Sequence, residues 1–140
     1  SKLIECEDKD KFKLYGELIT ANLYRLPKYN VDSIELENYY DKSYYNEHKY
    51  IKIKTNEKEY MYVIYSVYVE AKDFSYMNIN FSDEQEWYNH IKSFKDKSMY
   101  DTLEDVAAND EILILQTCST HKDYLKYDRK FLLVVAKQVK

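Results

Sequence analysis

Glycine and proline are almost absent from this chain of 140 residues, which contains one of each. A Gly/Ser-rich linker is therefore missing, and the length fits one domain that can bury a core of its own. Hydrophobic residues make up 45% and charged residues 33% of the sequence. This balance is typical of a globular domain rather than of a disordered chain.

Cysteine is also scarce, since Cys6 and Cys118 are the only two in the sequence. Two cysteines so far apart do not form the framework of a disulfide-stabilised fold. The sequence has no CxxC motif and no His/Cys cluster with the spacing of a zinc site. We therefore expect no metal ion and no cofactor.

Long hydrophobic runs and charge of a single sign are missing as well. No apolar run approaches the ~18 residues that span a bilayer. No signal segment is visible, so any membrane anchor is expected outside this sequence. The net charge is −4, with lysines and acidic residues interleaved, and we expect no nucleic-acid partner. Tyrosine, in contrast, occurs seventeen times and suits half-buried strands in which the hydroxyl stays hydrated.

Two segments have the apolar periodicity of helices. In residues 9–26 the apolar side chains recur at three- and four-residue spacing, at Phe12, Tyr15, Ile19, Leu23 and Leu26, and Pro27 would end this helix. A second helix is expected over residues 83–97, where Ser82 and Gln85 suggest a capping box. Its apolar face would carry Trp87, Ile91 and Phe94.

Four segments are expected to form strands. Residues 50–55 alternate with period two, residues 56–58 suit a turn, and residues 60–70 return as a long strand, which predicts a β-hairpin. Residues 111–118 and 130–139 are almost continuously apolar, which indicates burial on both faces at the centre of a sheet or barrel. Residues 34–40 are ambiguous between a strand and a helical turn.

Cys118 ends one of these apolar runs and Arg129 begins the next, so we expect both side chains to converge on one groove. A thiolate is the nucleophilic form of cysteine. A guanidinium stays charged and offers several donors to a developing oxyanion. The pair therefore fits thiolate chemistry on an acyl substrate. From the spacing alone, however, the favoured interpretation is a buried structural thiol with Arg129 in a surface ion pair.

The surrounding sequence shifts the preference from a structural thiol toward a catalytic one. The residues before and including the thiol read Ile114-Leu-Gln-Thr-Cys118, and the related stretches are residues 44–53, 65–69, 128–129 and 131–137. From about Asn38 onward the sequence resembles the class B sortases, cysteine transpeptidases that attach proteins to Gram-positive cell walls. The family signature is Thr-Leu-x-Thr-Cys, in which Ile114 takes the place of the first threonine.

The resemblance implies a mechanism and its partners. Cys118 would attack the amide that follows the threonine of a sorting-signal peptide, and an amine of a peptidoglycan precursor would resolve the thioacyl intermediate. Arg129 would stabilise the oxyanion or hold the peptide. Gln116, Thr117 and Ser119 would line the groove beside the thiol. The protein would act at the extracellular face of the cell membrane.

The catalytic histidine of the family has no counterpart in this chain. By the resemblance it lies in a Gly-His-Asn-type turn, upstream of the helix that precedes the strand beginning at Tyr50. The histidines of this chain are His48, His90 and His121. His48 aligns with a non-catalytic part of the family, and His90 falls on the second helix. His121 follows Cys118 by three residues in a loop, where a histidine is usually exposed and seldom a base.

The first third of the chain has a different likeness. Residues 14–24 and 31–41 resemble the NFACT family, also called fibronectin-binding protein A, whose members take part in ribosome-associated quality control. The segment Glu37-Asn-Tyr-Tyr-Asp41 belongs both to the stretch that resembles the NFACT family and to the stretch that resembles the sortases. The chain is therefore interpreted as a hybrid. Residues 1–37 would be an NFACT-like helical segment that is not a full domain, and residues 38–140 a sortase B-like catalytic C-terminal portion.

The expected fold class is mixed β with helices (α+β). It would be an incomplete or modified sortase-type β-barrel with an N-terminal helix and a helix inserted between two late strands. Three functions stay open. The first is a sortase B-like transpeptidase. The second is a catalytically inactive hybrid or fragment without the histidine, acting as a peptide-binding or interaction module. The third is an NFACT-like helical interaction segment carried on a β scaffold.

Overall fold

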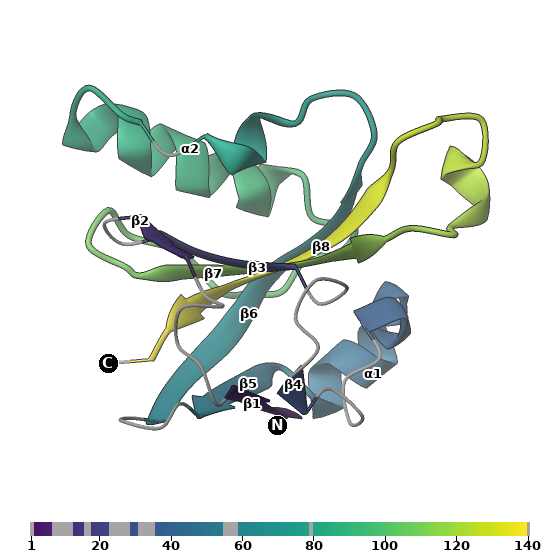
Figure 1. The fold of residues 1–140 in the computed structure, drawn as a ribbon, viewed down its shortest axis with the longest axis horizontal. Coiled ribbons are helices and arrows are strands. Elements are labelled where there is room, and N and C mark those ends of the chain that lie inside the picture. The colour runs from purple at the N-terminus through teal and green to yellow at the C-terminus, as the bar shows by residue number, and fades with distance from the viewer. Residues whose placement is uncertain are drawn as a thin grey trace.

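The computed structural model of the chain has an α+β fold, in which helices lie on both sides of one sheet (Figure 1). It describes residues 2–6, 13–15, 18–22, 29–30, 36–54, 59–78 and 80–139. The strands are β1 (Lys2–Cys6), β2 (Lys13–Tyr15), β3 (Leu18–Asn22), β4 (Tyr29–Asn30), β5 (Tyr50–Lys54), β6 (Glu59–Glu70), β7 (Ile112–Cys118) and β8 (Phe131–Gln138). The helices are η3 (Leu36–Tyr40), α1 (Lys42–Glu47), η4 (Ser75–Met77), α2 (Glu84–Asp96) and η5 (Lys122–Tyr124).

The strands form one mixed sheet in the order β2-β3-β7-β8-β6-β5-β1-β4. Its centre is an antiparallel block of four strands, β7-β8-β6-β5. The N-terminal strands extend this block on both sides, because β3 pairs with β7 and β1 pairs with β5, each in parallel. Within the described residues the outer strands β2 and β4 do not pair with each other. The sheet is therefore open, and the expected barrel is only partial.

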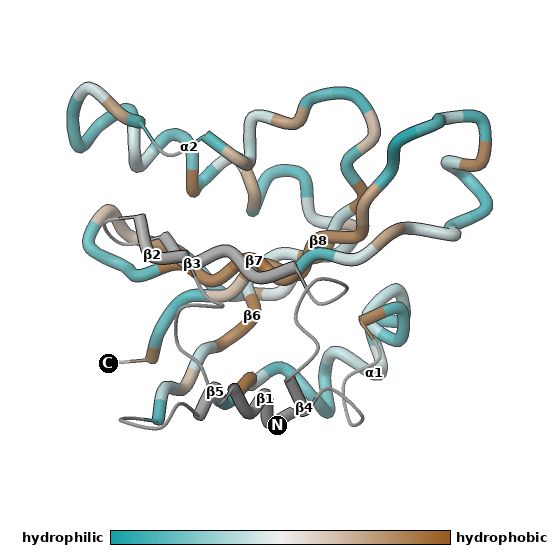
Figure 2. The backbone as a smooth tube through the Cα atoms, viewed as in Figure 1, coloured by the Kyte–Doolittle hydropathy of each residue, from teal (hydrophilic) through white to brown (hydrophobic). Residues whose placement is uncertain are grey.

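Each face of the sheet has its own hydrophobic layer. Helix α2 covers one face, where Phe94 packs with residues of β7 such as Ile114. The elements η3 and α1 cover the other face, where Tyr39 and Tyr45 pack with Leu115. Figure 2 shows the apolar residues gathered in the central strands, with polar residues along α2 and in the loops. Successive residues of a strand point to opposite faces, so β7 has to be apolar throughout.

The long strand β6 contains a β-bulge, which lets apolar side chains of both halves of the strand point into the same hydrophobic layer. Ile64 pairs with Ala136 and Ser66 pairs with Val135, so Tyr65 is an extra residue without a partner of its own on β8. An inserted residue shifts the alternation by one. As a result, apolar side chains before and after the bulge belong to the layer of η3 and α1, namely Tyr62, Ile64, Val67 and Val69.

The predicted central strands and the hairpin are confirmed. β7 and β8 are adjacent and antiparallel at the middle of the sheet. β5 and β6 pair in antiparallel register from Tyr50 with Val63 to Lys54 with Glu59. The turn predicted at residues 56–58 lies outside the described residues. Residues 36–40 of the ambiguous segment form the 3₁₀ helix η3.

The second predicted helix is also confirmed, between β6 and β7, but its N-cap was assigned to the wrong residue. The cap is Asp83, whose carboxylate accepts a hydrogen bond from the Glu86 backbone N–H at 2.8 Å. The Glu86 carboxylate in turn accepts a hydrogen bond from the Ser82 backbone N–H at 3.3 Å. The Glu86 carboxylate thus bonds the residue before the cap, whereas in a capping box this bond returns to the cap residue itself. Asp caps a helix as well as Ser does, so the sequence alone left the choice open.

The N-terminal helix predicted over residues 9–26 is wrong, because the described residues of this segment form strands. β2 and β3 make an antiparallel pair, and β3 then pairs with β7 from Leu18 with Ile112 to Asn22 with Gln116. Pairing with a strand so remote in sequence overrides the local helical period, and Ile19 and Thr20 are β-branched. The remaining positions of the predicted helix, and Pro27, lie outside the described residues.

Over the same described ranges, none of the helices has both the length and the apolar character that crossing a bilayer requires.

Candidate active site

Cys118 is the last residue of β7, and its thiol is exposed. Its Cα partner on β8 is Phe131, whose partner on β6 is Glu70, so these three residues form one row across the sheet. Directly paired residues have their side chains on the same face. By the alternation along β7 this is the face of Ile114, which α2 covers. The exposure of the thiol argues against a buried structural cysteine.

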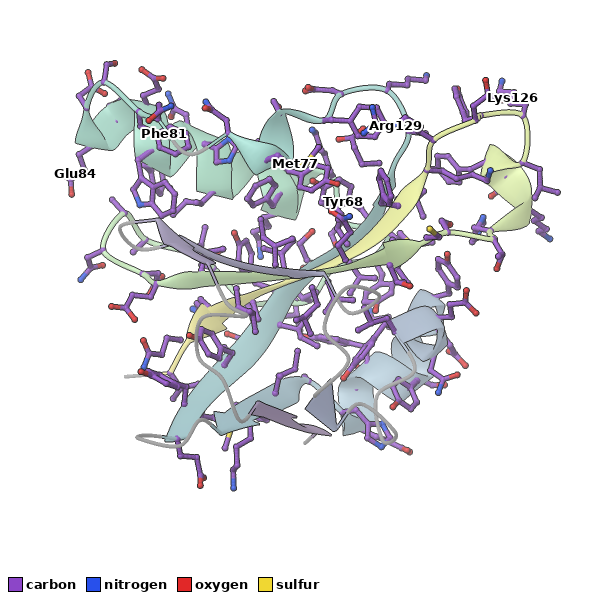
Figure 3. All side chains as sticks on the ribbon, viewed as in Figure 1. Tyr68, Met77, Phe81, Glu84, Lys126 and Arg129 are labelled. Carbon is purple, nitrogen blue, oxygen red and sulfur yellow. The ribbon has the colours of Figure 1, made fainter. Side chains whose placement is uncertain are left out.

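Arg129 lies two residues before Phe131 and stacks on aromatic rings beside this row. Its guanidinium carbon is 4.5 Å from the centroid of the Phe74 ring and 5.8 Å from that of Phe131. Figure 3 shows Arg129 on the same side of the sheet as Tyr68 and Met77. The thiol and the guanidinium therefore flank the same residue, Phe131, at one end of the β7–β8 pair.

Gln116 precedes Cys118 by two residues on the same face of β7 and is buried. Its side-chain oxygen accepts a hydrogen bond of 2.6 Å from the hydroxyl of Tyr76, in η4. Burial raises the pKa of Tyr76 to about 12, and the charge of Arg129 acts in the opposite direction. The hydroxyl therefore stays a donor at physiological pH, and Gln116 serves as its acceptor beneath the surface that carries the thiol.

The loop between β6 and η4 is held close to this surface by a buried carboxylate. Glu70 accepts hydrogen bonds from the backbone N–H groups of Lys72 and Asp73 at 3.3 and 3.1 Å. Its other oxygen is 3.2 Å from the ammonium of Lys97, just after α2. The loop that carries Phe74 is thereby tied both to the end of β6 and to the end of α2.

Ser119 belongs to the opposite layer. It is only 4% exposed, and its hydroxyl is 2.6 Å from that of Tyr40 in η3. The backbone N–H of His121 donates to the same Ser119 oxygen at 3.2 Å. Thr117, which alternates with Cys118 along β7, is partly buried. Among the residues predicted to line the groove, Gln116 and Ser119 thus contact elements on opposite faces of the sheet.

The histidines occupy structural positions. His48 stacks on the Tyr44 ring at 4.0 Å, with its Nδ1 atom 3.0 Å from the Tyr44 carbonyl oxygen. His90 lies on α2 among aromatic rings, including Phe94 at 4.8 Å. His121 caps η5, where its Nδ1 atom accepts a hydrogen bond from a backbone N–H. In the part of the chain that the structure describes, no hydrogen bond joins a histidine to the Cys118 thiol.

Among the residues that the structure describes there is no group of three or more His, Cys, Asp or Glu residues that could hold a metal ion. The sequence interpretation missed Phe74, Tyr76 and Tyr40. Each contacts a predicted site residue that is remote in sequence, and no periodic pattern or motif marks such a contact.

No protein-family model matches the chain. Sequence similarity nevertheless relates it to sortase B proteins. A sortase B of Listeria monocytogenes is 29% identical over 92 residues, which cover 66% of this chain and 37% of that protein. A sortase B of Staphylococcus aureus is 29% identical over 105 residues, which cover 75% of this chain and 42% of that protein. The chain thus matches about two fifths of the length of these curated relatives.

Solved structures extend this similarity to the fold. Sortase B of Clostridium perfringens superposes with a TM-score of 0.67 at 25% identity, over 88% of this chain and 64% of that one. A substrate complex of Staphylococcus aureus sortase B gives a TM-score of 0.65 at 25% identity, over 88% of this chain and 54% of that one. The chain therefore has a sortase B-like fold and is similar to sortase-type transpeptidases. A match over 88% of the chain extends into residues 1–37, and it lends no support to the NFACT likeness of residues 9–41.

Proposed function

We propose that this chain carries the nucleophile of a sortase B-type transpeptidase, with Cys118 as that nucleophile. The observation that carries the proposal is the exposed thiol at the end of β7, with the Arg129 guanidinium against Phe131, the residue paired with Cys118. The sequence similarity to sortase B supports the same assignment.

The proposed reaction has two steps. The Cys118 thiolate attacks the amide carbonyl that follows the threonine of a sorting-signal peptide, the C–N bond breaks, and the released amine takes up a proton. A cell-wall amine of a peptidoglycan precursor then attacks the thioester, which forms a new amide and returns the thiolate. In both steps Arg129 donates hydrogen bonds to the oxyanion or to the peptide beside it.

Further assignments rest on this proposal. The bound peptide would be flanked by Gln116, Thr117 and Ser119. Of these residues, Gln116 and Ser119 would fix the backbone on either side of the thiol. Residues 38–140 would be the sortase B-like catalytic portion, and residues 1–37, of NFACT-like sequence, contribute strands β1 to β4 to the same sheet. The likeness to sortase B also suggests action at the outer face of the cell membrane of a Gram-positive bacterium.

One observation favours a second candidate function, in which the chain binds sorting-signal peptides without turnover. A neutral thiol is a weak nucleophile, and proton transfer by a base is the usual remedy. His48, His90 and His121 are engaged in stacking, in an aromatic layer and in a helix cap. A chain in which no histidine serves the thiol would retain the peptide-binding surface and lack the catalyst.

The test uses the full chain with a fluorogenic sorting-signal peptide, and Cys118→Ala as the matched control. Cleavage or a thioacyl adduct by mass spectrometry, absent in Cys118→Ala, supports the transpeptidase. A Cys6→Ser variant should behave as the parent chain does. Added imidazole supplies the missing base, so acceleration by imidazole would identify an otherwise competent site. Binding of the peptide without adduct, with or without imidazole, would favour the second function.

A further inference from the structure

Arg129 rests in a corner made by two aromatic rings. The ring centroids of Phe74 and Phe131 are 6.0 Å apart with an interplanar angle of 79°. The guanidinium carbon lies 4.5 Å from the first centroid and 5.8 Å from the second. Both distances are within the range of favourable cation–π interaction.

The nature of these contacts leaves the donors of the guanidinium available. A cation–π contact takes up no hydrogen bond of the guanidinium, whereas a carboxylate would occupy the N–H edges that a peptide carbonyl requires. Within the described ranges, Arg129 has no salt-bridge partner at 4.0 Å or less, although Asp128 is its neighbour in sequence. The ring therefore restricts the side chain without consuming its hydrogen bonds.

Phe74 itself is held firmly on both sides. Before it, Glu70 accepts hydrogen bonds from two backbone N–H groups of the loop. After it, the buried Tyr76 hydroxyl donates to Gln116 on β7. The ring is thus fixed relative to the strand that ends at Cys118, and it contacts the strand paired with β7 through Phe131.

We propose that Phe74 is a positioning residue that holds the Arg129 guanidinium beside Cys118. An arginine side chain loses rotamer freedom when it is fixed, and the Phe74 ring fixes it before a substrate arrives. The inference rests on the role proposed above for Arg129, but its test requires no turnover.

The contact is measured by NMR of the arginine Nε–H groups, of which the chain has two, from Arg25 and Arg129. Arg129→Met assigns the second signal. Phe74→Leu should move this signal downfield by removing the ring above the guanidinium. Phe74→Tyr restores the ring and should return the signal toward its original position. Phe81→Leu, which deletes a ring packed against Trp87 and His90 instead, is the matched control.

The consequence is measured by alkylation of Cys118 at fixed pH, followed by mass spectrometry of the peptide that contains it. The nearby positive charge should raise the rate of alkylation by anionic iodoacetate relative to the rate by neutral iodoacetamide. In a water-like medium, a unit charge between about 4 and about 10 Å away changes the ratio of the two rates about two- to sixfold. Arg129→Met should abolish this preference. Phe74→Leu should lower it in the parent chain and leave it unchanged in the Arg129→Met background.

The inference is overturned if Phe74→Leu alters neither the NMR signal nor the alkylation ratio, or if Arg129→Met leaves that ratio unchanged. Thermal unfolding establishes that each variant is folded, and Phe74→Met replaces Phe74→Leu if the latter is not. Failure of the transpeptidase proposal has a different signature. The peptide then gives no adduct, while the charge preference of Cys118 and its dependence on Phe74 persist.

Discussion

Removing one oxygen atom from Tyr76 tests how the loop after β6 is attached to β7. Tyr76 is 1% exposed and its hydroxyl donates to Gln116, which is 8% exposed. Tyr76→Phe deletes a hydrogen bond worth about 1 kcal/mol net, and leaving a buried acceptor unsatisfied costs about 1 to 3 kcal/mol in all. We therefore expect the free energy of unfolding to fall by about 2 kcal/mol. For a chain of this length that corresponds to a decrease in Tm of roughly 6 °C.

The assay is equilibrium unfolding in urea, followed by circular dichroism and by fluorescence of the single tryptophan. A double-mutant cycle with Gln116→Leu isolates the pair. Gln116→Leu alone leaves the Tyr76 hydroxyl without its acceptor and should also destabilise the chain. When both partners are apolar no buried polar atom is left unpaired, so the double variant should lose at least ~1 kcal/mol less than the sum of the single losses.

Two results would refute this reasoning. One is a Tyr76→Phe variant that unfolds at the same urea concentration as the parent chain. The other is strict additivity in the cycle, which would mean that the two side chains do not depend on each other. A change in the slope of the transition would point instead to an altered denatured state.

Three further predictions concern other parts of the fold. Burial, reinforced by Lys97, lowers the pKa of His90 from 6.5. The unfolded chain therefore takes up the proton first, and stability should be fully present above about pH 6.5 and decline as the pH falls through the folded pKa. In Tm measured against pH, His90→Gln should lose this decline. Asp83→Ala removes the N-cap of α2 and should lower the free energy of unfolding by about 1 kcal/mol, with Asp96→Ala at the other helix end as the comparison. Leu103 is 85% exposed and has φ of 60°. Leu103→Gly should raise the free energy of unfolding by about 0.5 kcal/mol, because relief of the backbone outweighs the entropy of glycine, and no gain in urea unfolding would contradict this.

The parts of the fold that follow from local pattern could be predicted. The Ile, Leu and Val runs of β7 and β8 admit few arrangements other than central strands, and α2 has both a cap and an apolar face. The same reasoning failed for residues 13–22, because what decides their state is pairing with β7 and not their own periodicity. Local preference is a weak guide wherever a remote strand offers hydrogen bonds.

The candidate site was predictable only at its chemical centre. Cys118 and Arg129 are visible because their residue types carry the chemistry and because they bound two apolar runs. Their supports are not visible in the same way. Tyr40 and Ser119 are 79 residues apart, and Tyr76 and Gln116 are 40 apart. Tyrosine and phenylalanine at such separations leave no periodic trace, particularly among seventeen tyrosines.

The parallel pairing of β3 with β7 affects the order in which the sheet can form during synthesis. Every residue pair between these strands is 94 positions apart, as in Leu18 with Ile112, whereas the pairs between β1 and β5 are 49 apart, as in Lys2 with Ile51. During synthesis at about 5 to 20 residues per second, β3 emerges roughly 5 to 20 s before its partner exists. Contacts this remote in sequence also slow folding itself. During this period of seconds the edge of β3 that will pair with β7 has no partner strand in a nascent chain, and it is open to chaperones or to other chains until the thiol-bearing strand β7 is made.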